Sequence, residues 1–356
     1  MKPPAPSDLF IVSSSPHIHS GESVERIMLD VLIALMPAVL AACWFFRLDA
    51  LRLTAVCVAS CLLTEWLCRK AMKRANTLSD LSAAVTGVLL AFNLPPALPT
   101  WMAVAGSVFA IGIAKQVFGG IGYNPFNPAL AGRAFMLISF TGAMTLWSPS
   151  AWTQKLAGAA ADALTTATPL GYAKEALKSG VALPAFNSGM LTDFFLGNVN
   201  GCIGETSALA LLTGAAYLLY RKVITWHIPS AYLLTVFIYA AILHSVAPAT
   251  ALPPLFHLLS GGLILGACFM ATDMATTPVT RRGMVIFGIG CGIVTMLIRT
   301  VKTGVYPEGV SFAILVMNAF TPLINRATRH RVFGSKKDRG TDRSPIQNPK
   351  KLTPFP

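Results

Sequence analysis

Long apolar runs are the feature that most constrains what this chain of 356 residues can fold into. Runs of roughly 20 residues, the length that an α-helix needs to cross the hydrocarbon core of a bilayer, recur between short polar connections. Only 12% of the residues are charged, whereas a soluble domain usually carries about 25%. We therefore expect an all-α polytopic membrane protein. The first 25 residues lack the apolar core of a cleavable signal peptide.

The apolar runs and the breaker residues between them predict ten transmembrane spans. The spans are placed at residues 27–46, 51–68, 77–93, 98–118, 127–146, 205–220, 228–247, 252–271, 282–300 and 308–325. The fifth span is the weakest, because Asn127, Pro128 and Arg133 fall within its first turns. The regions of the chain are then a tail at 1–26, spans one to five at 27–146, a long loop at 147–204, spans six to ten at 205–325, and a basic tail at 326–356.

The distribution of basic residues indicates the orientation in the membrane. With a cytoplasmic N-terminus, the cytoplasmic side holds 20 Lys and Arg residues and the opposite side holds 7. Nine of the 20 lie in the tail from Arg326 onward, which an odd number of spans would place outside. We therefore expect both termini in the cytoplasm and the 147–204 loop outside. The net charge of +13 follows from this topology and does not indicate nucleic-acid binding.

The sequence contains no pattern typical of a metal site. None of the seven cysteines forms a Cys-x-x-Cys pair, and six fall in apolar segments, where Cys commonly behaves as a small hydrophobic residue. Cys57 and Cys61 lie one helical turn apart and supply too few ligands for an iron–sulfur cluster within this chain. The histidines show no ligand spacing. The acidic residues fall near helix ends, so we expect no carboxylate at mid-membrane.

A faint internal repeat links the two membrane regions. The segment Leu81-Ser-Ala-Ala-Val-Thr-Gly resembles Leu259-Ser-Gly-Gly-Leu-Ile-Leu, about 180 residues later. With five spans in each half, the halves would have opposite topology, as in many transport folds. The similarity predicts a five-plus-five inverted repeat, although apolar segments also resemble one another by chance.

The long loop carries the most distinctive motif, Asp162-Ala-Leu-Thr-Thr-Ala-Thr168-Pro-Leu. Pro169 favours an extended backbone at Thr168, and the small neighbouring residues leave its hydroxyl unshielded. A modifying enzyme is therefore expected to reach that hydroxyl. From composition alone, the alternative is an ordinary loop rich in Ser and Thr.

This motif resembles the flavinylation sequence Asp-x-x-Thr/Ser-x-Ala-Thr of one membrane family. The family comprises the D subunit of Rnf electron-transport complexes and the B subunit of the sodium-translocating NADH:quinone reductase. There a flavin transferase joins FMN through its phosphate to the last Thr, which is Thr168 here, and Asp162 occupies the acidic recognition position. The likeness covers nearly the whole chain and includes Asn124-Pro-Phe-Asn-Pro-Ala-Leu-Ala-Gly-Arg133, Ala271-Thr-Asp-Met-Ala-Thr-Thr-Pro278 and the last span after Tyr306-Pro-Glu-Gly309.

The resemblance implies a subunit of a redox complex in the bacterial inner membrane. Such a complex moves electrons between reduced ferredoxin and NAD⁺, coupled to sodium or proton movement. Its other subunits include a second covalent-flavin subunit and iron–sulfur subunits. This chain has neither a nucleotide-binding glycine loop nor cluster ligands, so we expect an electron relay in contact with lipid, without a complete active site. The Pro-Leu after Thr168 and the lack of a longer N-terminal extension favour Rnf over the quinone reductase. The alternative from another class is a flavin-free channel or transporter for a small solute.

The resemblance also implies a second, non-covalent flavin, riboflavin, nearer the cytoplasm. Asn124 and Asn127 in one motif, and Asp273 and Thr277 in the other, match the donors and acceptors on the edge of an isoalloxazine. The alternative interpretation is helix capping by these residues at the membrane boundary. Arg133 lies two turns into a span, where Arg normally faces a partner or a cavity. Its expected partner is Asp273 or a flavin carbonyl, and the alternative is a structural pairing with helix ends.

Overall fold

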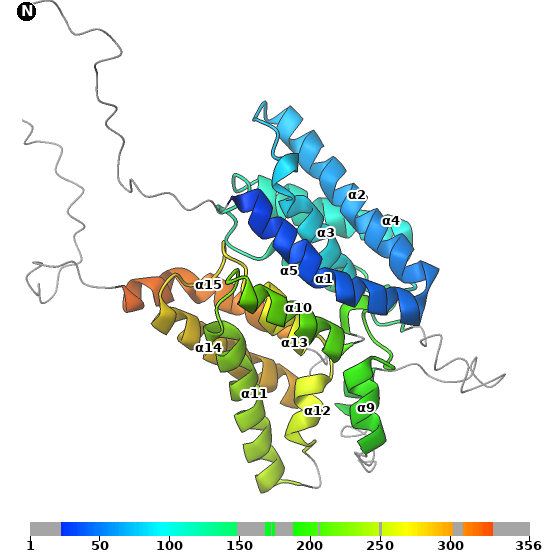
Figure 1. Ribbon diagram of the computed structural model, residues 1–356, viewed down its shortest axis with the longest axis vertical. Helices are drawn as coiled ribbons and strands as arrows, with labels where there is room; N and C mark the ends of the chain where they lie inside the picture. Colours follow the sequence, from blue (N-terminus) through cyan, green and yellow to red (C-terminus); the bar gives the residue numbers. More distant parts are fainter. Residues whose placement is uncertain are drawn as a thin grey trace, which may run out of the picture.

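Helices make up every regular element in the described part of the chain (Figure 1). The computed structural model describes residues 23–147, 168–171, 173–174, 188–205, 207–248, 251–301 and 309–329. Five of its helices are long and apolar enough to cross a membrane: α1 Val24–Phe46, α2 Leu48–Ala71, α11 His227–Val246, α14 Arg281–Thr300 and α15 Val310–Thr328. The expected all-α membrane fold is confirmed.

The other expected spans correspond to shorter or broken helices. They are η2 Leu78–Asp80 with α3 Ser82–Phe92, α4 Thr100–Val108 continuing as the π-helix η3 Phe109–Gln116, α5 Pro128–Ser139 with α6 Thr141–Met144, α10 Ala208–Tyr220, and α12 Pro254–Leu259 with α13 Leu263–Leu265 and the π-helix η6 Gly266–Met270. Two further short helices, α9 Ser188–Leu196 and η5 Ile203–Glu205, lie within the expected long loop and at its end. The prediction of one continuous helix in each of three ranges is therefore wrong: 77–93, 127–146 and 252–271.

Two of the breaks produce half-length helices that end together in the interior. Helix α3 has 11 residues, about 16 Å at 1.5 Å per residue, which is roughly half of a hydrocarbon core of about 30 Å. It ends at Asn93, whose Nδ2 lies 3.6 Å from Sδ of Met270. Met270 is the last residue of η6, the end of the other broken helix. Helix ends at membrane depth are tolerated only where protein or a cavity surrounds them.

The starts of the two broken helices also correspond. Helix α3 follows Leu81, which has a left-handed φ of 59°, and α13 follows the turn at Gly261, which has a φ of 69°. Lys115 donates to Ser82 Oγ at 2.6 Å, and Arg299 donates to the backbone oxygen of Ser260 at 3.1 Å. Ser82 and Ser260 are the second residues of the two repeat segments. Equivalent turns are thus bound by a cation from the following span, which supports the five-plus-five repeat.

Figure 1 shows α1 to α5 in one group and α10 to α15 in another beside it. Helices α1 and α10 join the groups at a close crossing. A Cβ added to Gly214 of α10 would lie 2.0 Å from the backbone oxygen of Ala34, so only glycine permits this approach. Small residues let helix backbones approach closely in membranes, and the crossing of α11 and α14 at Gly288 is built in the same way.

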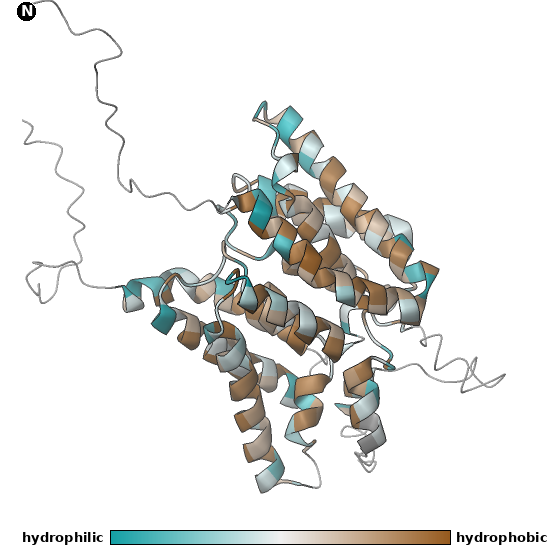
Figure 2. Cartoon of the chain, in the orientation of Figure 1, coloured by the Kyte–Doolittle hydropathy of each residue, from teal (hydrophilic) through white to brown (hydrophobic). Residues whose placement is uncertain are grey.

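Apolar side chains lie on the outside of the molecule as well as in its core. Leu40, Trp44 and Val117 are more than half exposed. Figure 2 shows brown, hydrophobic residues along the long helices and teal, hydrophilic residues gathered toward their ends. Polar residues are buried instead, Glu65 and Lys115 among them. This distribution suits a molecule whose flanks face lipid and whose interior holds the functional groups.

Candidate functional site

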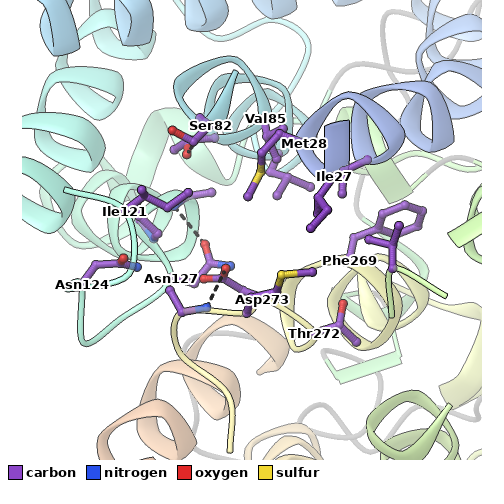
Figure 3. A pocket seen from close by; sticks show the side chains of 18 of the residues that line it. Ile27, Met28, Ser82, Val85, Ile121, Asn124, Asn127, Phe269, Thr272 and Asp273 are labelled. Atoms are coloured by element: carbon purple, nitrogen blue, oxygen red, sulfur yellow. Dashed lines mark hydrogen bonds between the residues drawn. The ribbon is translucent and has the colours of Figure 1, made fainter. Parts of the chain in front are cut away.

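A pocket lies among α1, α3, η3, the start of α5, α10 and η6 (Figure 3). We call it the Asn127 pocket. It holds about 90 Å³ of free space, below the range of about 300–1,000 Å³ typical of small-molecule sites. Both π-helical segments contribute to its wall, through Lys115 of η3 and Phe269 of η6. Such segments recur at functional sites.

Asn124 and Asn127 line this pocket, as the sequence motif predicts. Asn127 caps α5: its Oδ1 accepts from the backbone nitrogens of Ala129 at 3.0 Å and Leu130 at 3.4 Å. Its Nδ2 donates to the backbone oxygen of Met270 at 3.2 Å. The Asn124 amide donates to the backbone oxygen of Phe126 at 3.0 Å. The capping interpretation of Asn127 is therefore confirmed, and the same residue forms part of the pocket wall.

Asp273 lines the Asn127 pocket from the segment after η6, next to Thr272. Its carboxylate accepts from the backbone nitrogen of Ala275 at 3.4 Å and from Thr276 Oγ1 at 3.3 Å. Thr277 is not part of the pocket wall, and its hydroxyl donates to the backbone oxygen of Asp273 at 2.8 Å. The two motifs are thus brought together at Asn124, Asn127 and Asp273, whereas Thr277 shapes the turn that holds Asp273.

Arg133 contacts the end of a helix rather than Asp273. Its Nη1 donates to Asn93 Oδ1 at the end of α3, and Arg133 is not among the residues that line the Asn127 pocket. Asn93 also donates to the backbone oxygen of Leu89 at 2.6 Å. A cation is favourable at a helix C-terminus, where the helix dipole is negative. The pairing with Asp273 is therefore wrong, and the pairing with helix ends is confirmed.

Thr168 lies on the wall of a second, smaller pocket, which also includes Asn200, Glu205 and Ser260. We call it the Thr168 pocket. The side chain is only 5% exposed, and its Oγ1 accepts from the backbone nitrogen of Gly171 at 3.1 Å. The expectation of an unshielded hydroxyl is wrong, because the chain just after Thr168 is anchored: Leu170 packs in a cluster with Ala173, Phe194, Leu252 and Phe256. Asp162 lies outside the described residues.

Sequence reasoning missed a buried ion pair beside the Asn127 pocket. Lys115 Nζ lies 2.8 Å from Glu65 Oε2, and the two side chains are 3% and 0% exposed. Lys115 is on the pocket wall and Glu65 is not. A usable signal was present, since both charges fall within predicted apolar spans.

The fold and the two pockets define a polytopic helical membrane protein in which two half-length helices meet in the interior. The pockets share no lining residue, so they are separate. The chain belongs to the NQR2, RnfD, RnfE family, whose model matches residues 11–334.

Curated relatives resemble the chain over almost their whole length. The D subunit of the Na⁺-translocating ferredoxin:NAD⁺ oxidoreductase complex of Acetobacterium woodii is 49% identical, over 92% of this chain and 96% of the relative. Its proton-translocating counterpart from Clostridium ljungdahlii is 43% identical, over 93% and 98%. The D subunit of the ion-translocating oxidoreductase complex of Stutzerimonas stutzeri is 43% identical, over 88% and 92%.

Proposed function

We propose that the chain is the D subunit of an Rnf complex and relays electrons within an ion-translocating ferredoxin:NAD⁺ oxidoreductase. This proposal rests on three relatives that are named as D subunits and that the chain matches over almost their whole length. It is favoured over the B subunit of the sodium-translocating quinone reductase, which belongs to the same family. The names of the first two relatives specify different ions, so they leave the choice between sodium and proton open.

The first relay group is FMN, joined through its phosphate to Thr168 Oγ1 by a flavin transferase that recognises Asp162. A phosphate is compatible with the end of a membrane protein but not with its lipid-facing middle. The pocket position of Thr168 supports the assignment because a tethered flavin is then held against protein. Because the Thr168 hydroxyl is buried, the transferase cannot reach it in this arrangement. FMN is therefore transferred either after Thr168 leaves the pocket wall or before the residues that follow Thr168 pack against the protein.

The second relay group is riboflavin in the Asn127 pocket. An isoalloxazine has flat apolar faces and one edge of hydrogen-bonding groups. The pocket offers both kinds of surface, with Met28 and Phe269 as apolar wall and Asn124 and Asp273 as polar groups. The mixed lining is typical of cofactor sites, and a bound ring requires the free space of about 90 Å³ to widen. The protein binds and orients the flavin there, and the redox chemistry belongs to the cofactor.

A chain of contacts joins the two pockets through the interior and supports the role of a relay. Asn127 donates to the backbone oxygen of Met270, whose sulfur accepts from Asn93. Cys202 Sγ lies 3.4 Å from the backbone oxygen of Asn93. Glu205, on the wall of the Thr168 pocket, donates from its backbone nitrogen to the oxygen of Cys202 at 3.0 Å. A continuous series of contacts between protein groups therefore links the two proposed flavin sites.

In-gel fluorescence of the denatured protein tests the covalent flavin. Wild-type protein is expected to fluoresce under ultraviolet light after denaturation, and Thr168→Ala is expected to lose the signal while remaining in the membrane. A fluorescent Thr168→Ala protein would place the attachment elsewhere, with Thr165 and Thr166 as the nearest alternatives. A wild-type protein without fluorescence would favour a flavin-free transporter.

A further inference from the structure

Four basic residues gather at the end of α2, and we call them the α2 cluster: Arg69, Lys70, Lys73 and Arg74. Arg69 is partly buried and the other three are exposed. Among the described residues, none of the four forms an ion pair with a carboxylate. Glu65, one turn before Arg69, is paired with Lys115 at 2.8 Å instead. The described part of the chain therefore leaves the positive charge of the cluster uncompensated.

The turn after α2 brings the cluster together. The backbone nitrogen of Arg74 donates to the oxygen of Arg69 at 3.0 Å, and that of Lys73 donates to the oxygen of Lys70 at 3.2 Å. These are the two bonds of a Schellman motif. Lys73 has a φ of 53° and occupies the left-handed position of this motif, where glycine is the usual residue. A basic side chain thus stands where glycine would have the lower conformational cost.

Arg69 and Arg74 are positioned by the loop that follows η3. A Cβ added to Gly120, which has a φ of 107°, would lie 2.5 Å from Arg69 Nη2, so glycine leaves room for the guanidinium. Arg74 Nη1 donates to the backbone oxygen of Gly119 at 3.5 Å. Arg69 Nε has no hydrogen-bond partner in the described part of the chain. The arginines are therefore held at the surface without an anionic partner from this part of the protein.

The exposed face of α2 that leads to the cluster is apolar. Leu63, Trp66 and Leu67 are 56%, 40% and 50% exposed, and their spacing places them on one side of the helix with Lys70. Lys70 Nζ lies 4.8 Å from the centroid of the Trp66 ring, which is a cation–π contact. Trp is enriched where the hydrocarbon core meets the headgroups. This face therefore joins side chains that suit hydrocarbon to cations at headgroup depth.

We infer that the α2 cluster binds the phosphate of an anionic phospholipid whose acyl chains lie along the apolar face of α2. Basic clusters next to a membrane span attract anionic lipids. A lipid matches both features, because its negative headgroup continues into hydrocarbon, whereas a soluble acidic surface matches the cations alone. Topology requires only that positive charge lie on one side, and it explains neither the Lys70–Trp66 contact nor the left-handed Lys73. The inference does not depend on either proposed flavin.

Native mass spectrometry of the purified complex tests this site, with phosphatidylglycerol as the anionic probe and phosphatidylcholine as the zwitterionic one. The wild-type complex is expected to retain a phosphatidylglycerol that an equal concentration of phosphatidylcholine does not replace. In Arg69→Gln/Arg74→Gln, the affinity for this lipid is expected to fall about tenfold. The matched control is Arg281→Gln/Arg282→Gln, which removes two exposed cations at the start of α14 and is expected to keep the lipid.

Loss of the lipid in the α2 variant alone supports the inference. Equal loss in both variants, or a wild-type complex that retains no such lipid, overturns it. A variant that keeps the lipid but loses another subunit of the complex also overturns it, because the cluster then forms a subunit contact. If the arginine variant does not assemble, Lys70→Gln/Lys73→Gln, which changes only exposed side chains, decides by the same measurement.

Discussion

The side chain of Asn127 connects three parts of the molecule. It caps α5 through its oxygen, donates to the end of η6 through its nitrogen, and forms part of a pocket wall. An N-cap of this kind contributes about 0.5–2 kcal/mol to stability. Loss of a buried amide partner costs about 1–3 kcal/mol more. A substitution at this position therefore has to separate capping from ligand binding.

Two substitutions of Asn127 make that separation. Asn127→Leu removes both functions, and we expect the riboflavin content of the purified complex to fall roughly tenfold or more, at about 1.4 kcal/mol per tenfold. Asn127→Ser keeps a good cap residue but lacks the amide. If riboflavin falls in both variants while FMN on Thr168 is intact, the amide contributes to the flavin site. Riboflavin unchanged in Asn127→Ser would return Asn127 to capping alone.

Asp162 is a second residue-scale prediction, and it concerns the transferase rather than the folded protein. Asp162→Ala keeps the acceptor Thr168, so the covalent FMN content, measured by in-gel fluorescence against protein, is expected to decrease without disappearing. The protein level in the membrane serves as the control. Full loading in this variant would exclude a recognition role for the acid.

Residues of the site differed in how far the sequence could predict them. Asn127 was predictable because it stands beside Pro128, and Asp273 because it lies in a polar segment that ends at Pro278 and interrupts an apolar run. The partner of Arg133 was not, because it depends on where α3 ends. The 5% exposure of Thr168 was also beyond local reasoning, since it arises from packing of Leu170 against the distant Phe256.

At the scale of elements, the close crossing of α1 and α10 controls the shape of the Asn127 pocket. Helix α1 supplies Ile27, Met28 and Val31 to its wall. Gly214→Ala places a Cβ against the backbone of Ala34, and overpacking of this kind costs about 1–3 kcal/mol. We expect a lower unfolding temperature and less retained riboflavin.

The matched control for this crossing is Gly142→Ala in α6, where an added Cβ meets no atom within 4 Å. A thermal unfolding assay in detergent, followed by acid extraction of flavin, compares the two variants. Equal stability and equal riboflavin in both would show that the α1–α10 contact does not shape the pocket.

The broken helices explain why the predicted spans differ from the observed helices in their continuity. Hydropathy detects apolar residues whether or not the backbone is helical. The chain after Asn93 stays apolar through Leu94, Pro95 and Pro96 although α3 has ended. In the second half, the Ser260-Gly261-Gly262 turn interrupts a run that hydropathy alone reads as one helix. The faint repeat was the only sequence signal that related these two breaks.

For the whole molecule, the 20-to-7 partition of basic residues predicts both termini on the cytoplasmic side. A reporter fused after Lys351 is expected to be active only in the cytoplasm, and one inserted near Lys155 only outside. Dual reporters that work in opposite compartments measure this directly. An external C-terminus would mean an odd number of spans, with the interrupted α5–α6 region as the first suspect.

Peptide mass spectrometry of the purified protein tests most directly whether Thr168 carries FMN. The peptide containing Thr168 is expected to gain the mass of FMN less one water, with fragment ions that place the phosphoester on Thr168. A protein from a host with the flavin transferase in which Thr168 is unmodified, or in which the flavin is on Thr165 or Thr166, would contradict it.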